Sequence, residues 1–433
     1  MSKKWILVAA VLVGAFFIES GIGAKEKITL IHWHFGGIQP EHDWVTEMDK
    51  KWNAENPHIQ IKRVFQDWAT KRERMISAFT RKALPDTICL DTPSIPDFVR
   101  IGILRPLDEV NSEMVKSWEP RFVPEIWNTV IYEGHVYAVP TYVDMATMMG
   151  YNTRMFAEMG LLPPTTWDEL KEVARKFKAR GIAGIIIPGA GTTNDVNIFE
   201  GMVWANGGRW LSEDGKKVVI NGPGGVDVMQ LWADLYNERL APEAAIETDY
   251  YEAILAFFQN QGAMALGMSW IPAIEGEVAT APGFQYRLTL APRNPKPSGN
   301  FSPASTIMAP TTAFMLTTGC KHPEAAMEYL NFVASQEFQQ GWDGDPIPGR
   351  VPATKANWES PDLLKCYPDL VPLYRRGELF KGSLPMPAFP GLIQMEVELG
   401  KAIQSVLLGE ISAKEALDKV AEKSQKILEK VSK

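Results

Sequence analysis

In the first part of the chain, apolar and polar positions follow strand and helix periods in alternation. Short apolar runs at residues 28–31, 59–65 and 86–90 predict three strands, and amphipathic stretches at 44–56 and 70–83 predict the helices between them. This β-α-β-α-β order predicts an α/β fold with a mostly parallel sheet and helices on both of its faces. Because ligands of such sheets bind beyond the carboxyl ends of the strands, the residues that follow each strand are the first candidates for a site.

A second α/β region is predicted after residues 137–140. Thr166 and Glu169 have the spacing of a capping box at the start of a helix that Gly181 ends. The same periodicities predict strands at 184–188, 262–270 and 312–317, and helices at 226–237, 250–260, 323–340 and 413–431. Residues 291–303 hold four prolines and therefore predict a connection rather than part of a sheet. A length of 433 residues predicts two domains.

The N-terminus has the pattern of a secretory signal peptide. A basic head, Ser2-Lys3-Lys4, precedes an apolar run at 5–18, and small residues at 21–24 offer a cleavage site near Ala24. The run is too short to cross a bilayer comfortably, although an uncleaved anchor stays an alternative. No cysteine follows the run, which argues against a lipid anchor. We expect a signal peptide at 1–24 and a periplasmic or otherwise extracytoplasmic location.

Composition narrows the class of protein. The chain is 45% hydrophobic and 22% charged, which is ordinary for a globular protein. A net charge of -8 argues against a nucleic-acid binder, since such proteins usually carry a basic excess. The three cysteines, Cys89, Cys320 and Cys366, are too few and too widely spaced for a disulfide framework or a metal site. A Cys320–Cys366 bridge is left open.

Searches for catalytic motifs find none. The chain lacks GxxxxGK[ST], HExxH, GxSxG and GxGxxG patterns, so no cofactor is expected. A pair of carboxylates such as Asp144 and Glu200 stays an alternative, because glycosidase carboxylates need only meet in space. The absence of motifs favours a binding protein over an enzyme.

His32 and His34 alternate with the strand period, so both rings are predicted on one side of the first strand. Two polar rings at the rim of a pocket are one interpretation, and a partly exposed strand end is another. A metal site would need two more ligands, of which only His42 is near in the sequence. We therefore expect no metal.

Fourteen tryptophans are many for this length, and several lie where predicted elements end. Burial in the core is the default for each one, but as a set they favour an aromatic-lined cleft. Charged residues stand beside or near them, or follow the third predicted strand. The candidates are Trp33, Trp68, Trp210, Trp270 and Trp342, with Asp67, Asp91, Arg209, Asp343 and Arg350 as their polar companions.

A cleft with aromatic faces and charged side chains fits a carbohydrate. Covering about 100 Å² of a sugar face gains on the order of 2–3 kcal/mol. A charge-assisted hydrogen bond to a hydroxyl group adds roughly 1.5–3 kcal/mol. A few such contacts, less the cost of ordering, suffice for about micromolar binding.

At this point the chain resembles the extracytoplasmic solute-binding proteins of bacterial ABC sugar importers, the group that includes maltodextrin-binding protein. Each matching segment is weak alone, but their order extends over nearly all of the chain after the signal. The segments are 28–37 (ITLIHWHFGG), 85–88 (PDTI), 102–108 (GILRPLD), 150–152 (GYN), 162–170 (LPPTTWDEL), 262–270 (GAMALGMSW), 321–334 (KHPEAAMEYLNFVA) and 409–417 (GEISAKEAL).

The resemblance implies a two-lobed periplasmic-binding-protein fold of type II, with a ligand cleft between lobes that close on the ligand. It implies three crossings of the hinge, which we place near Pro140, near 292–303 and near Pro352. The expected N-terminal lobe comprises 25–139 and 304–351. The expected C-terminal lobe comprises 140–303 and 352–433.

The resemblance also implies roles for residues. In this family the Trp after the small-residue strand stacks on the sugar, a role that carries to Trp270. The loop after the first strand, 32–36, usually supplies polar contacts. The positions of Asp91, Tyr142, Asp144 and Trp210 match places where family members contact ligand. Maltodextrin binders place an aromatic residue where Glu396 stands here, and Phe389 is a candidate substitute.

The sequence therefore predicts an extracytoplasmic receptor that binds a sugar or oligosaccharide and delivers it to the membrane permease subunits of an ABC importer. We expect a monomer that binds no nucleic acid. The same scaffold with a polyol or glycerol-phosphate-type ligand is the first alternative, and a secreted glycoside hydrolase is a remote one.

Overall fold

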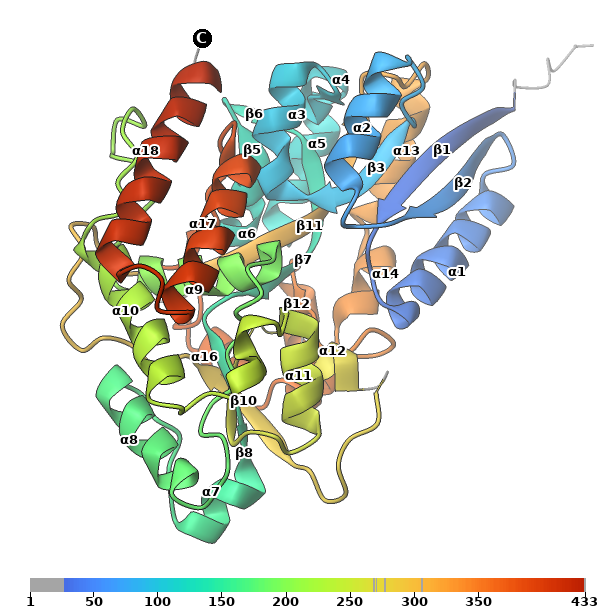
Figure 1. Ribbon diagram of the computed structural model, residues 1–433. Helices are drawn as coiled ribbons and strands as arrows, with labels where there is room; N and C mark the ends of the chain where they lie inside the picture. Colours follow the sequence, from blue (N-terminus) through green and yellow to red (C-terminus); the bar gives the residue numbers. More distant parts are fainter. Residues whose placement is uncertain (1–26, 268, 270, 276–277, 305–306, 432–433) are drawn as a thin grey trace, which may run out of the picture.

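The computed structural model describes residues 27–267, 269, 271–275, 278–304 and 307–431. Its main sheet has the strand order β12-β7-β11-β3-β1-β2, and β4 and β13 pair with β11 outside this path (Figure 1). The strands of this sheet are β1 (Ile28–Phe35), β2 (Ile59–Gln66), β3 (Thr87–Asp91), β4 (Leu104–Arg105), β7 (Ala138–Met145), β11 (Ile307–Thr317), β12 (Val351–Pro352) and β13 (Leu384–Pro385).

The strand directions confirm one part of the prediction and correct another. β1 is parallel to both β2 and β3, as the β-α-β-α-β pattern predicts. β11 is antiparallel to β3 and β7, however, and β12 is antiparallel to β7, so the sheet is mixed rather than mostly parallel. No single crossover helix joins β3 to β11, so the βαβ rule does not set the direction of β11. Its register places Thr312 opposite Asp91 on one side and Tyr142 on the other.

Helices cover the main sheet because each buries one apolar stripe against it. In α1 (Gln39–Glu55) the buried positions Glu41, Val45, Asp49 and Trp52 recur every three or four residues. This face therefore carries two carboxylates into the interior. The other helices of this region are α2 (Lys71–Thr80), α3 (Ile95–Ile101), α4 (Leu107–Val110), α5 (Ser112–Trp118), α6 (Pro124–Trp127), α13 (Pro323–Val333) and α14 (Gln336–Gln339), beside a hairpin of β5 (Ile131–Tyr132) and β6 (His135–Val136).

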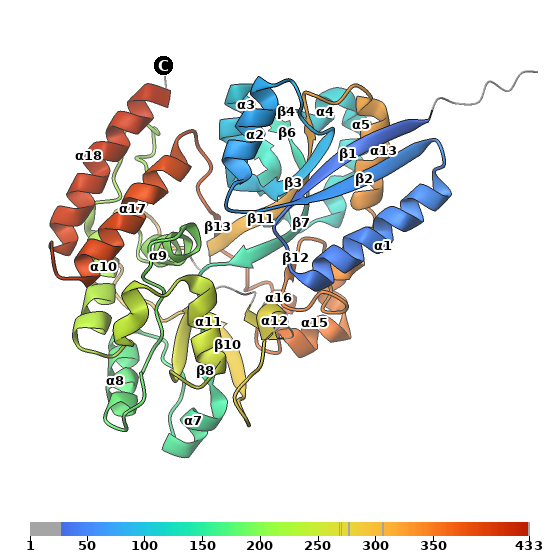
Figure 2. The same cartoon turned by 45° about the vertical axis from the view of Figure 1, so that its right-hand side comes forward.

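A second region lies below the main sheet in the view of Figure 2. Its sheet has the order β10-β8-β9 and is antiparallel throughout, which is a further correction to the predicted parallel arrangement. Its strands are β8 (Met148–Asn152), β9 (Met264–Gly267) and β10 (Tyr286–Leu290). Its helices include α7 (Thr153–Met159), α8 (Trp167–Lys178), α9 (Thr193–Ala205), α10 (Pro223–Asn237), α11 (Tyr250–Phe258) and α12 (Ile271–Glu275).

The C-terminal part of the chain returns to this second region. α17 (Leu392–Leu407) and α18 (Ala413–Val431) pack against each other and against α10, and α17 also packs against α9. α15 (Pro361–Cys366) and α16 (Leu370–Arg375) lie near the join of the two regions (Figure 2). β7 of the main sheet leads directly into β8, and the chain comes back at β11 and β12. The lobe boundaries stay a prediction.

Several predicted elements differ in detail. The capping box of α8 is confirmed, since Thr166 accepts a hydrogen bond from the Glu169 amide and Glu169 accepts one from the Thr166 amide. Residues 184–188 form no strand: Ile186 makes an isolated bridge with Ala265, and Ala183, just before the segment, makes one with Gly262. The helix predicted at 323–340 divides into α13 and α14, and Ser335 caps the second. No element was predicted at α9 or α17.

The three cysteines are unpaired, so the Cys320–Cys366 bridge does not form. Within the described residues, no helix combines the length and the apolarity that a membrane span requires. The predicted signal peptide at 1–24 lies outside the described residues.

Candidate functional site

A pocket of about 260 Å³ lies where the main sheet meets α9. We call it the inter-lobe pocket. The main-sheet side contributes the loop after β1, the residue Trp68 after β2, and side chains of β7 and β11; the other side contributes α9. The lining residues are Gly36, Gly37, Ile38, Trp68, Tyr142, Asp144, Asn194, Asn197, Thr312 and Arg350.

Local backbone chemistry shapes this pocket. Gly36 has φ +69°, and a Cβ there would lie 2.8 Å from the indole of Trp68, so the glycine lets the ring lie against the loop. Tyr142 and Asp144 are two residues apart on β7 and therefore share a face. At Gly201 of α9, a Cβ would lie 3.1 Å from the side chains of Ala146 and Thr147, so the glycine allows α9 to approach the end of β7.

A buried charged triad forms one wall of the pocket. The guanidinium of Arg350 lies 3.6 Å from Glu41 and 3.5 Å from Asp144, and it covers the Tyr142 ring at 4.5 Å. Burial raises the pKa of Asp144 to about 6 against the opposing charge of Arg350. Burial also opposes ionisation of Glu41, but the hydrogen bond from His34 and the charge of Arg350 keep its pKa below the ordinary value. Asp144 Oδ1 accepts no hydrogen bond within the described chain.

A second charged group begins next to Trp68. The ammonium of Lys71 lies 3.9 Å from the Trp68 ring centre and 2.6 Å from Asp91, which also accepts a hydrogen bond from Ser94. Lys71 and Asp91 act electrostatically on Glu396 of α17, whose pKa burial raises to about 7. Burial and the charge of Glu396 raise the pKa of Glu200 on α9 well above its ordinary value. We call Lys71, Asp91, Glu200 and Glu396 the carboxyl cluster.

The structure brings part of the predicted site together. Trp68, Tyr142, Asp144 and Arg350 line the inter-lobe pocket, and Asp91 belongs to the adjoining carboxyl cluster. Asp67 is exposed and accepts a hydrogen bond from the Thr70 amide just before α2. Trp270, the residue with the clearest role by resemblance, lies outside the described residues, so its stacking role stays a prediction.

Other predicted site residues are buried away from the pocket, which corrects their assignment. His32 is fully buried, bonds Thr87 at 2.9 Å and stacks on Phe314 at 4.9 Å. His34 is fully buried between Glu41 and Arg63. The cause is that helices cover the face of β1 that carries both rings: α1 supplies Glu41 beside His34, and α13 supplies Tyr329 beside His32. Neither ring is at a pocket rim, and the described residues contain no group of three metal-ligating side chains.

Several aromatic candidates are likewise buried or packed away from the inter-lobe pocket. Trp210 is buried and donates a hydrogen bond to Glu200, while Trp342 is fully buried beside Phe338. Trp33 and Phe389 are half-buried against the core and do not line the inter-lobe pocket. Position at the end of an element therefore selected Trp68, which lines the pocket, together with rings that are buried inside a lobe.

Sequence reasoning missed the contribution of α9. Asn194 and Asn197 line the pocket from this helix, and Glu200 follows one turn later. The missed signal was Thr192 followed by Asp195, a capping-box spacing that the structure forms. Glu41 and Lys71 were also missed, because each lies on a helix whose apolar stripe was the only feature considered.

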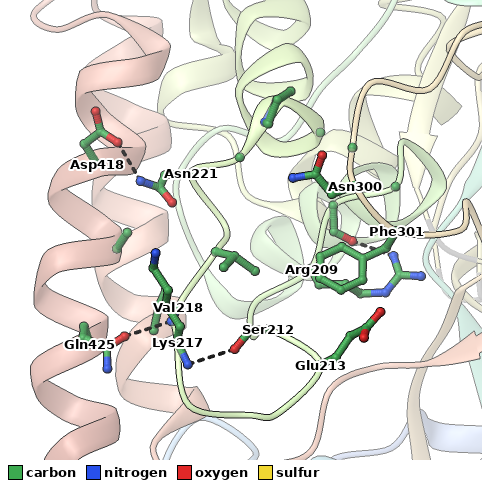
Figure 3. Close-up of a pocket in the computed structure, with 18 of the residues that line it drawn as sticks. Arg209, Ser212, Glu213, Lys217, Val218, Asn221, Asn300, Phe301, Asp418 and Gln425 are labelled. Atoms are coloured by element: carbon green, nitrogen blue, oxygen red, sulfur yellow. Dashed lines mark hydrogen bonds between the residues drawn. The ribbon is translucent and has the colours of Figure 1, made fainter.

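A larger groove of about 850 Å³ lies elsewhere, on the second region alone (Figure 3). Its polar groups largely bind one another: Asn221 donates to Asp418, and Gln425 accepts from the amide of Val218. The guanidinium of Arg209 donates hydrogen bonds to backbone carbonyl oxygens, including that of Ser302. Because two structural regions build the inter-lobe pocket and its carboxylates are incompletely bonded, we take that smaller pocket as the candidate site.

Comparisons with known proteins show the family of the chain. A family model described as bacterial extracellular solute-binding protein matches residues 39–340. A putative binding protein of Brucella abortus is 25% identical over 390 residues, 89% of each chain. An ABC transporter extracellular-binding protein of Pyrococcus horikoshii is 26% identical over 380 residues, 82% of this chain and 81% of its own. The diacetylchitobiose binding protein of Streptomyces coelicolor is 24% identical over 334 residues, 75% of this chain and 73% of its own.

Solved structures confirm the two-lobed α/β fold. The maltose-bound MalE3 of T. maritima has a TM-score of 0.77 at 21% identity and covers 92% of this chain and 99% of its own. A solute-binding protein of Thermotoga lettingae, bound with α-D-tagatose, has a TM-score of 0.77 at 24% identity. The match covers 93% of this chain and 100% of that protein. At these identities the likeness concerns the fold alone.

Proposed function

Because this chain belongs to the bacterial extracellular solute-binding protein family, we propose that it captures a sugar or short oligosaccharide in the inter-lobe pocket and delivers it to an ABC importer. One observation carries the proposal: aromatic and charged side chains of the main-sheet region and amide side chains of α9 line one small pocket. The names of relatives and structural neighbours, which mention diacetylchitobiose, maltose and tagatose, support a carbohydrate.

The pocket chemistry suits a sugar ring. Trp68 offers an indole face, while Asp144 and the amides of Asn194 and Asn197 offer acceptors and donors for hydroxyl groups. Asp144 Oδ1 already lacks a hydrogen bond within the described chain, so a hydroxyl donor would satisfy it. The volume of about 260 Å³ lies below the roughly 300–1,000 Å³ of ordinary ligand pockets. A mono- or disaccharide therefore fits better than a long oligosaccharide.

A phosphorylated ligand fits less well. A phosphate needs cations that carboxylates do not already neutralise. Among the described residues, Arg350 of the pocket pairs with Glu41 and Asp144, and the neighbouring Lys71 pairs with Asp91. A neutral linear polyol would use the same polar groups but would gain less from the face of Trp68. These points favour a cyclic sugar over a polyol or polyol phosphate.

The rest of the proposal follows from the family. We propose that the chain is exported through its segment 1–24, works as a monomer and performs no catalysis. The lobes are assigned as 25–139 with 304–351 and as 140–303 with 352–433. In support, β7 passes into β8 and the chain re-enters the main sheet at β11. The boundaries at 139/140 and 351/352 cut through β7 and β12, and β13 pairs with β11 in the main sheet. Closure of these lobes would bury the ligand.

A ligand screen on the purified full chain tests the proposal. Mono- and disaccharides should raise the melting temperature by mass action, and calorimetry of the best ligand should fit one site. The ligand should be recovered chemically unchanged, and small-angle scattering should show compaction on saturation. A hydrolysed ligand would contradict a receptor role, and a panel of neutral and amine-bearing sugars without any melting shift would contradict the carbohydrate.

A further inference from the structure

A second pocket, of about 320 Å³, is also lined by both regions of the molecule. Thr311 of β11 lines it, whereas the next residue, Thr312, lines the inter-lobe pocket. Because successive residues of a strand point to opposite faces, the two pockets lie on opposite sides of β11. One face of α9 serves both, since Asn197 lines the inter-lobe pocket and Trp204, seven positions further along, lines the second pocket. We call the second one the Arg209 pocket, after the cation that lines it.

Three parts of the chain form the walls of the Arg209 pocket. The segment 384–388 provides mainly apolar surface, the second region provides the end of α9 with Arg209, and the main-sheet region provides hydroxyl and amide groups. Among the described residues that line the pocket, Arg209 is the one charged side chain, and none is acidic. The pocket therefore suits a ligand that carries one negative charge. The polar residues of the main-sheet region are Thr92, Asn128, Thr129 and Thr311.

The cation of Arg209 has no acidic partner within the described chain. Arg350 and Lys71, by contrast, both form ion pairs with carboxylates near the inter-lobe pocket. Burial lowers the pKa of the Arg209 guanidinium, and no described carboxylate opposes this effect. Because burial of a charge is costly without a counter-ion, an anion in the pocket would be bound favourably.

Backbone carbonyl groups hold this guanidinium in place and leave one edge of it unbonded. Nη1 donates to the carbonyl oxygens of Trp204 and Gly208, and Nη2 donates to that of Ser302 at 2.8 Å. The ring of Phe301 lies beside it, 5.5 Å from the guanidinium carbon (Figure 3). The N–H of Nε and the second N–H of Nη2 have no acceptor within the described chain. Adjacent N–H groups of this kind can bind a carboxylate through two parallel hydrogen bonds.

The hydroxyl group of Thr311 is a second, independent sign of a missing ligand group. Thr311 is 1% exposed and lines the Arg209 pocket, yet its Oγ1 makes no hydrogen bond within the described chain. The buried hydroxyl of Thr141 on the neighbouring strand β7, by contrast, donates to the carbonyl oxygen of Thr312 at 2.9 Å. Buried hydroxyl groups without a partner are rare in proteins. A carboxylate oxygen in the pocket would supply the acceptor that Thr311 lacks.

We propose that the Arg209 pocket binds a small organic carboxylate, whose oxygens accept hydrogen bonds from Nε and Nη2 of Arg209 and from the hydroxyl of Thr311. One carboxylate matches the one cation, and the hydrocarbon part of the ligand packs against Leu384 and Met386. This inference goes beyond the proposed sugar receptor and does not rest on it, because the two pockets share none of their described lining residues.

Two probes of the same shape and different charge test the proposal: butyrate, a carboxylate, and butyramide, its neutral amide. Both are titrated into the purified full chain by calorimetry, with the ionic strength kept equal by sodium chloride so that screening is the same. Butyrate should bind at one site and about tenfold or more tightly than butyramide, the value of one charge-assisted hydrogen-bonded contact. Equal binding of the two probes, or no binding of butyrate up to about 20 mM, would overturn the proposal.

Matched variants identify the cation that holds the carboxylate. Arg209→Gln should remove most of the preference for butyrate, and Arg209→Lys should keep part of it, because the charge remains without the paired N–H groups. Lys217→Gln is the control, since Lys217 lines the larger groove but not the Arg209 pocket. This variant should bind butyrate as the wild type does. A preference that survives Arg209→Gln would contradict the assignment.

Thr311→Val separates the Arg209 pocket from the larger groove, which Arg209 also lines. The change removes a buried hydroxyl group that has no partner in the described chain, so the unfolding free energy should stay the same or rise. The affinity for butyrate should fall about fivefold to tenfold, because one hydrogen bond to the carboxylate is lost. Unchanged affinity for butyrate in this variant would move the anion to the larger groove and overturn the proposed site.

Discussion

Two buried charged groups in this protein contrast in how completely they are bonded. In the region of the main sheet, the guanidinium of Arg63 donates two hydrogen bonds to the carboxylate of Asp49, at 2.7 and 2.9 Å. It also donates to the hydroxyl of Tyr329 at 2.7 Å and to the ring of His34 at 2.9 Å. We call Arg63, Asp49, Tyr329 and His34 the Arg63 network. In the carboxyl cluster, by contrast, Glu200 Oε2 is buried and accepts no hydrogen bond within the described chain.

The Arg63 network also sets the protonation of its histidine. Arg63 can only donate, so His34 Nδ1 accepts and its Nε2 carries the proton toward Glu41. Burial lowers the pKa of His34 despite the opposing hydrogen bond to Glu41, which keeps the ring neutral. A network closed within one lobe stabilises the fold. The carboxyl cluster, by contrast, leaves a buried carboxyl oxygen of Glu200 without a hydrogen bond in the described chain.

The largest expected effect comes from breaking the Arg63 network. Arg63→Met removes the partner of a buried carboxylate and should cost about 3–5 kcal/mol of unfolding free energy, measured by urea denaturation. Arg63→Lys keeps the charge and should lose less. Arg175→Met breaks an exposed pair with Glu238 and should change stability by less than about 1 kcal/mol. If Arg63→Met lowered the unfolding free energy no more than Arg175→Met does, the Arg63 network would not stabilise the fold.

A substitution in the carboxyl cluster should change the unfolding free energy by a smaller amount and in the opposite direction, toward higher stability. The pKa of Glu396 is about 7 in the folded protein and ordinarily 4.5, so the unfolded chain releases this proton first as pH rises. The folded state therefore loses stability between about pH 4.5 and 7, on the order of 3 kcal/mol in total. Glu396→Gln should remove this loss and be the more stable protein at neutral pH.

Denaturation series across this pH range measure the effect. The two proteins should have similar stability near pH 4.5 and diverge as pH approaches 7. Glu398→Gln should follow the wild type between pH 5 and 7, since ion pairs with Lys401 and Lys423 lower the pKa of Glu398. Parallel pH profiles for the wild type and Glu396→Gln would show that Glu396 is not a buried acid.

The smallest effect in this series concerns binding rather than stability. Trp68→Ala should weaken sugar binding by about 2 kcal/mol, roughly thirtyfold in the dissociation constant, because it removes the ring that lines the inter-lobe pocket. Some stability should also be lost, since the ring is half-buried against the core, as that of Trp33 is. Trp33→Ala is the control: that ring packs against the core and away from the pocket, so it should lower stability and spare affinity. A reversed pattern would move the site away from Trp68.

The sequence predicted more of the fold than of the site. Strand and helix periods located β1, α1, β2, α2 and β3 to within a few residues, because each element buries one regular stripe. The antiparallel course of β11 was missed, because a single strand pattern carries no direction. Alternation placed His32 and His34 on one face, but the interior position of that face depends on what packs against β1.

The same limit applies to the site. Trp68 and Arg350 were identified from residue type and position, and Tyr142 and Asp144 from the family resemblance. The structure gathers the four in one pocket. Trp210 and Trp342 had the same local signature, yet both turn into a lobe. Glu200 and Glu396 are 196 positions apart in the sequence, and only the packing of α9 on α17 brings them into electrostatic contact.

By itself, the sequence determined the periodic burial of its segments, the helix caps and the chemical inventory of aromatic rings and carboxylates, since these depend on neighbours within a few residues. Tertiary structure alone decided which charges are neutralised inside a lobe and which remain unpaired at the gap. The physical reason is that solvation and pairing energies of buried charges depend on distances between segments that are remote along the chain.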